Sequence, residues 1–135
     1  MRHVLAAVFV WALVSGAVQA DPIEDVITDQ LDAFNARDSE RAFSFASPMI
    51  KRLFGTPDNF GGMVARGYPM VWDNDFVRFL DRAERGDSVY QRLLISDATG
   101  TMFVLEYKMI ETPQGWQIDG VSILPAPDGV IAESW

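Results

Sequence analysis

The spacing of apolar residues along the chain changes once, near Gly67. Between Asp21 and that glycine, apolar residues recur every three or four positions, which is typical of helices that bury one face. From Phe76 onward, apolar and polar residues alternate, which is typical of β-strands. The sequence therefore predicts a helical first half and a second half built of strands.

Capping signals divide the helical half into four segments. Asp21 and Asp38 carry side chains that accept hydrogen bonds at helix N-termini, and Ser47 and Thr56 each precede a proline that suits a first helical turn. The predicted helices cover residues 21–37, 38–47, 47–55 and 56–67.

Two adjacent glycines, Gly61 and Gly62, lie inside the fourth predicted helix. Each costs about 1 kcal/mol relative to alanine in a helix interior, so the pair calls for an explanation. We expect the helix to pack closely against the sheet at this point. A kink beside a pocket is the alternative.

The second half carries four stretches with strand character, and Met70-Val71-Trp72 precedes them as a short expected edge strand. The turns between the stretches are short, and short turns join antiparallel neighbours. Helices and strands in separate halves predict an α+β fold. We expect one domain over residues 21–124, followed by an irregular tail over residues 125–135. The predicted strands cover residues 76–84, 88–96, 101–110 and 116–124.

The first 20 residues have the three-part pattern of a signal peptide. Arg2 gives a positive start, residues 4–18 are uncharged and mostly apolar, and Ala20 supplies a small residue for cleavage. An uncleaved membrane anchor is the alternative, but this run is shorter than the roughly 20 residues that a spanning helix needs. We therefore expect residues 1–20 to be removed and the mature domain, without stable membrane insertion, to be periplasmic or secreted.

The chain contains no cysteine, and its one histidine is His3, inside the expected signal peptide. Because the mature domain has neither residue, it cannot use Ser-His-Asp or Cys-His catalysis or form the usual zinc sites. We expect no catalytic residue, no metal and no cofactor. Loss of Arg2 changes the net charge from −8 to −9, since 10 basic and 19 acidic residues remain. Such an acidic domain repels nucleic acid and anionic membranes.

Several motifs of this chain resemble the DUF4864 family of uncharacterised exported bacterial domains, which is similar to the wider NTF2-like superfamily. They are the run from Phe54 to Phe60, Met63-Val64, Gly67-Tyr68-Pro69 and the closing strand from Gly115 to Gly120. The resemblance covers roughly Ile23 to Leu124. It implies N-terminal helices packed on a bent antiparallel sheet of four to five strands, forming a cone with a cavity.

The same resemblance leaves the activity open, because a fold does not define a function. In NTF2-like enzymes such as ketosteroid isomerases and limonene epoxide hydrolases, Asp, Tyr or Arg residues line the cavity. In other members the cavity is filled, or the sheet forms a homodimer. No catalytic motif of DUF4864 is available to carry over onto this chain.

Three aromatic residues are candidates for a ligand pocket. Tyr68 and Trp72 flank the step from helices to sheet, where they rim a pocket mouth or lock the crossover to the sheet. Alternation places Tyr107 with Phe103 and Leu105 on the buried face of its strand. Its hydroxyl then binds a ligand carbonyl or, more commonly for a core tyrosine, a backbone carbonyl. Trp116 is expected in the core.

Charged residues are weaker candidates. A carboxylate at Asp119 could act as a general base, but we expect it to face solvent. The acids of the first helix are expected to form a solvated face, and Glu106 and Lys108 part of a cross-strand charge set. Arginines of the strands either anchor an anionic ligand or, as we prefer, pair with acids on adjacent strands. These arginines are Arg78, Arg82 and Arg92, with Asp81 and Glu84 as expected partners.

Three functions are consistent with these features. The preferred one is a non-catalytic module that binds a small, largely apolar ligand in an NTF2-like cavity. The second is a protein-interaction or homodimerisation module that uses the outer face of the sheet. The third is a His-independent isomerase or hydrolase that uses Asp and Tyr, with Asp119, Tyr90 and Tyr107 as its candidates.

Overall fold

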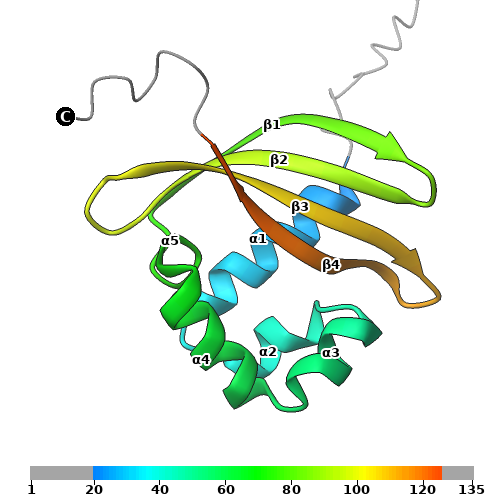
Figure 1. Ribbon diagram of the computed structural model, residues 1–135, viewed down its shortest axis with the longest axis horizontal. Helices are drawn as coiled ribbons and strands as arrows, with labels where there is room; N and C mark the ends of the chain where they lie inside the picture. Colours follow the sequence, from blue (N-terminus) through cyan, green and yellow to red (C-terminus); the bar gives the residue numbers. More distant parts are fainter. Residues whose placement is uncertain (1–19, 126–135) are drawn as a thin grey trace, which may run out of the picture.

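A computed structural model describes residues 20–125, in which a four-stranded sheet lies over five helices (Figure 1). The expected signal peptide and C-terminal tail lie outside these residues, apart from Ala20 and Pro125. The α+β fold class is confirmed, with all helices preceding all strands. The elements are α1 (Pro22–Asn35), α2 (Ser39–Ser44), α3 (Pro48–Phe54), α4 (Pro57–Gly67), α5 (Pro69–Trp72), β1 (Phe76–Arg85), β2 (Ser88–Ser96), β3 (Met102–Thr112) and β4 (Gly115–Leu124).

The first four helices begin where the capping signals predict. The Asp21 side chain accepts hydrogen bonds from the amides of Ile23 and Glu24 at 3.1 and 3.2 Å. Asp38, Ser47 and Thr56 each accept one from the amide three residues further on. These side chains satisfy backbone donors that have no partner within the helix, which fixes the starting points.

The strands follow the order β1-β2-β3-β4, and every neighbouring pair is antiparallel. Two irregularities interrupt the regular pairing, one in β1 between Phe79 and Arg82 and one in β4 at Asp119. Extra residues of this kind bend a strand and increase its twist. The twisted sheet consequently curves over the helices (Figure 1).

The expected edge strand over residues 70–72 is wrong, because these residues form the short helix α5. Pro69 occupies the first helical turn, and the amides of Val71 and Trp72 donate to the Tyr68 carbonyl. A pattern of three residues is too short to distinguish the two periods. One isolated parallel bridge, between Ala46 and Ile118, adds to the pairing of β4.

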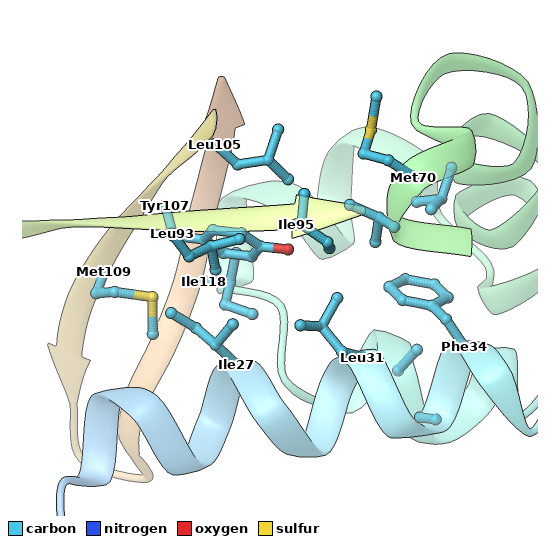
Figure 2. Close-up of a cluster of buried hydrophobic side chains, with 14 of the residues drawn as sticks. Ile27, Leu31, Phe34, Met70, Leu93, Ile95, Leu105, Tyr107, Met109 and Ile118 are labelled. Atoms are coloured by element: carbon cyan, nitrogen blue, oxygen red, sulfur yellow. The ribbon is translucent and has the colours of Figure 1, made fainter. Parts of the chain in front are cut away.

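The core lies between the inner face of the sheet, which faces the helices, and α1 (Figure 2). The predicted alternation in β3 is confirmed, since Leu105, Tyr107 and Met109 are completely buried and Phe103 is partly buried. Trp116, expected in the core, is only partly buried at its margin. The buried residues of α1 are Ile23, Ile27, Gln30, Leu31, Ala33 and Phe34.

The close approach expected at the paired glycines occurs, but its partner is helix α2 rather than the sheet. A Cβ added at Gly61 would overlap the Ser39 hydroxyl and lie 3.2 Å from Ser39 Cβ. A Cβ at Gly62 would meet only the guanidinium of Arg66, also at 3.2 Å. Gly61 therefore allows α2 and α4 to pack closely, whereas Gly62 has no such role.

Candidate functional site

A cavity of about 240 Å³ lies between the helices and the β3–β4 side of the sheet. Its wall is almost entirely apolar, and none of its residues carries a charge. The lining residues are Gln30, Phe34, Ala46, Ile50, Leu53, Phe54, Phe60, Met63, Val64, Tyr68, Val71, Tyr107, Ile118, Gly120 and Val121.

The cavity extends from the core to the surface. Phe34 and Tyr107 at its inner end are 1% and 0% exposed, whereas Leu53 on α3 is 68% exposed. Ile50, Tyr68 and Val121 have intermediate exposure. A ligand could therefore enter beside α3 and reach the centre of the domain.

Helix α3 forms one side of the cavity. None of its seven residues is fully buried, and Ile50, Leu53 and Phe54 line the cavity. The helix is fixed through Ser47, whose amide donates to the Ile118 carbonyl at 2.8 Å. The Ser47 hydroxyl donates to Asp119 Oδ1 at 2.7 Å. These contacts hold α3 to β4 without closing the cavity.

Tyr107 is the unusual polar group of the lining. Its hydroxyl is buried, and it has no hydrogen-bond partner among residues 20–125. The hydrogen bond to a backbone carbonyl, expected as the commoner case for a core tyrosine, is therefore not formed within the described part of the chain. Burial raises the pKa of Tyr107 well above its ordinary value, so the phenol keeps its proton. Since buried polar groups are nearly always paired, this unpaired donor needs an explanation.

The other two aromatic candidates lie in different surroundings. Tyr68 lines the cavity, and its hydroxyl donates to the Val121 carbonyl at 3.1 Å, so it both borders the site and ties the crossover to β4. Trp72 is outside the lining. Its ring packs 6.0 Å from the Phe34 ring, and the Arg37 guanidinium lies 4.3 Å from its centroid.

Sequence reasoning missed most of the apolar wall and also Gln30. This glutamine lies in the apolar stripe of α1, is 2% exposed, and donates from Nε2 to the Ala42 carbonyl at 3.1 Å. A polar residue at a buried helical position is the signal that would have identified it. The wall residues of α3 and α4 give no such signal, because cavity-lining and core residues have the same composition.

The solvent-facing position expected for Asp119 is only partly right. Its side chain is 11% exposed, because Lys108 Nζ lies 3.2 Å from Oδ2 while Ser47 occupies Oδ1. The hydrogen bond to this carboxylate raises the pKa of Lys108. Asp119 is outside the cavity lining, and its role in this structure is to hold the start of α3.

The expected pairing of the strand arginines holds at one of three positions, since Arg78 forms no ion pair within residues 20–125 and Arg82 pairs elsewhere. Arg92 Nε lies 3.0 Å from Glu106 Oε2, so the cross-strand charge set is confirmed there. Arg82 instead contacts α1, at 2.6 Å from Asp21 Oδ2 and 3.8 Å from Glu24 Oε2. It is in register with the buried Gln91 and therefore faces the helices rather than the acids of its own strand.

The groups required for the enzyme alternative are not assembled in this cavity. Tyr90 is in register with Lys108, so it lies on the outer face of the sheet, whereas Tyr107 points inward. No Asp or Glu of residues 20–125 lines the cavity. Across the same residues, no three potential His, Cys, Asp or Glu ligands gather around a common point. No helix within them has the length and apolarity to cross a membrane.

The described residues thus define an α+β domain whose helices and bent sheet enclose an apolar cavity open at one end. The chain belongs to the DUF4864 family, a domain of unknown function, whose model matches residues 17–131. The resemblance found in the sequence is therefore confirmed. A search of curated proteins found no match.

Solved structures extend the comparison of the fold. The solution structure of a SEC-C motif-containing protein from Rhodopseudomonas palustris has a TM-score of 0.53 at 14% identity, over 76% of this chain and 78% of that one. An NTF2-like protein of unknown function from Shewanella baltica has a TM-score of 0.49 at 12% identity, over 78% and 93%. A phospholipid-binding protein from Ralstonia solanacearum, in complex with a phospholipid, has a TM-score of 0.45 at 14% identity, over 76% and 75%. At such identities the likeness concerns the fold alone.

Proposed function

We propose that this domain is a non-catalytic module that binds a small, largely apolar ligand in the cavity between its helices and sheet. It would act in the periplasm or outside the cell, after removal of residues 1–20. The observation that carries the proposal is the buried, unpaired Tyr107 hydroxyl in an apolar wall. A purely structural tyrosine would be expected to bond to the protein, whereas a binding residue keeps its donor free for a ligand.

The dimensions of the cavity support a small ligand. An apolar cavity of about 150 Å³ is sufficient to bind benzene, and this one measures about 240 Å³. The apolar wall gives the ligand a favourable transfer from water of roughly 25 cal/mol per Å² of buried apolar surface. One ring with a short substituent, or an acyl chain of similar volume, fits this space.

Native mass spectrometry of the full chain, purified gently from an exporting host, tests the proposal. The wild type should carry a reproducible small adduct. Val64→Phe should lack it, because the larger side chain of this lining residue occupies the cavity. Val104→Phe is the matched control, since Val104 is partly exposed and lies on the outer face of the sheet.

Both variants must show the circular dichroism of the wild type. An adduct that Val64→Phe retains, or that Val104→Phe loses equally, would count against the cavity as the binding site. A bare wild-type protein that also fails to take up added α-methylstyrene would contradict the proposal as a whole.

A homodimer or a partner protein on the outer face is the second candidate function. Phe76 and Met102 are 47% and 45% exposed and both are in register with Ser96. Leu94 and Val104 continue the apolar surface in the next row. Sedimentation equilibrium of the wild type and of Met102→Lys tests this candidate, which requires a dimer that the lysine weakens. A wild type that stays monomeric would remove the homodimer.

A further inference from the structure

We propose that the ligand is an uncharged molecule with one hydrogen-bond acceptor, such as a ketone, aldehyde or ester carbonyl, which the Tyr107 hydroxyl binds at the inner end of the cavity. This inference rests on the proposed function, because it requires a ligand in that cavity. It adds the polarity, the charge and the orientation of the ligand.

Tyr107 is held as a preorganised donor. It lies on β3, which pairs with β2 on one side and β4 on the other. Its ring is completely buried in the cluster that includes Ile27 and Ile118, and its hydroxyl oxygen lies between the sheet and α1 (Figure 2). Since the ring is completely buried, ligand binding need not order this side chain.

Two other polar side chains of the lining each donate one hydrogen bond within the protein. Tyr68 donates its hydroxyl to the Val121 carbonyl, and Gln30 donates Nε2 to the Ala42 carbonyl. Tyr107 is thus the hydroxyl that residues 20–125 leave without a partner at this site. Burial keeps the phenol protonated by raising its pKa. An acceptor on the ligand is the group that satisfies it.

The wall selects against charge. None of the residues that form ion pairs within residues 20–125, Lys108 and Asp119 among them, lines the cavity. A carboxylate at the inner end would lose its hydration and gain no cation in return, which is strongly unfavourable. A cation would find no carboxylate there and would face a hydroxyl proton that needs an acceptor.

Aromatic rings shape the body of the site. The Phe60 ring centroid lies 5.8 Å from that of Phe34 and 5.6 Å from that of Phe54, in tilted and edge-on geometry. A ligand ring can extend this arrangement, which aromatic groups prefer to stacking face to face. The expected orientation places the carbonyl at Tyr107 and the apolar end toward Leu53 at the surface.

Three test compounds of equal heavy-atom count separate these features. Acetophenone offers a neutral carbonyl, α-methylstyrene replaces its oxygen with a methylene group, and benzoate carries a negative charge. Each is titrated into the isotope-labelled full chain, in the wild type and in Tyr107→Phe, and the amide shifts of the lining residues are followed by NMR. Because the two neutral compounds differ in hydration, the decisive quantity is the ratio of their affinities within each protein.

The wild type should favour acetophenone over α-methylstyrene roughly three- to tenfold more than Tyr107→Phe does, which corresponds to one hydrogen bond. Benzoate should bind at least about tenfold more weakly than acetophenone, because the cavity offers its charge no partner. A second measurement needs no variant. The carbonyl carbon of ¹³C-labelled acetophenone should shift downfield on binding to the wild type, as it does when a carbonyl accepts a hydrogen bond.

An unchanged affinity ratio in Tyr107→Phe, with both neutral compounds still bound, would overturn this inference and leave the proposed function standing. Benzoate binding as tight as that of acetophenone would overturn the selection against charge. If neither neutral compound shifts the lining amides of the wild type, the proposed function fails and this inference fails with it.

Discussion

Tyr107→Phe should stabilise the ligand-free protein, which is the opposite of what a core tyrosine usually shows. The hydroxyl is buried without a partner among the described residues, and an unsatisfied group of this kind costs about 1–3 kcal/mol. Removing the hydroxyl leaves a small void. Because cavity volume costs roughly 24 cal/mol per Å³, this void costs a few tenths of a kcal/mol. The net gain is about 1 kcal/mol or more, or roughly 4–8 °C in Tm for a domain of this size.

The assay is thermal unfolding of protein that has been unfolded in guanidinium and refolded, so that no bound ligand remains. Tyr68→Phe is the matched control, because the Tyr68 hydroxyl donates to the Val121 carbonyl at 3.1 Å. Its loss should destabilise the fold by about 0.5–1.5 kcal/mol. A Tyr107→Phe variant that loses stability as Tyr68→Phe does would show that the Tyr107 hydroxyl has a partner in the ligand-free state.

Two further predictions concern other parts of the fold. Gly62→Ala should raise the free energy of unfolding by up to about 1 kcal/mol through helix propensity, whereas Gly61→Ala should lower it by about 1 kcal/mol because the new Cβ would collide with Ser39. Urea unfolding of both variants measures these changes, and equal effects would contradict the packing of α2 on α4. Hydrogen bonds from Thr99 lower the pKa of Asp97, so its charge stabilises the folded state at neutral pH. That contribution should disappear as the pH falls below 3.8, the ordinary pKa of an aspartate. The Tm values of wild type and Asp97→Asn should therefore converge at low pH, and parallel curves of Tm against pH would refute this.

The sequence was most informative where structure depends on neighbours in the chain. Asp21, Asp38, Ser47 and Thr56 cap helices through contacts within three residues, so their positions could be read directly. Alternation along β3 likewise placed Tyr107 on the buried face. Helix α5 was missed because its pattern is only a few residues long.

The site depends on contacts between distant parts of the chain, which the sequence does not display. The cavity lies beneath α3, and α3 is fixed by the bond from Ser47 to Asp119, 72 positions apart. Arg82 contacts Asp21 over 61 positions, although acids lie much nearer to it in the sequence. That Tyr107 has no protein partner could be recognised only after all surrounding side chains were placed.

The central claim is that a small neutral ligand occupies the cavity, and intermolecular NOEs between acetophenone and the labelled full chain test it most directly. The account predicts NOEs from the ligand to the methyl groups of Val64 and Ile118, which line the cavity. NOEs confined to outer-face methyls such as those of Leu94 and Val104, or no NOEs at saturating ligand, would contradict it.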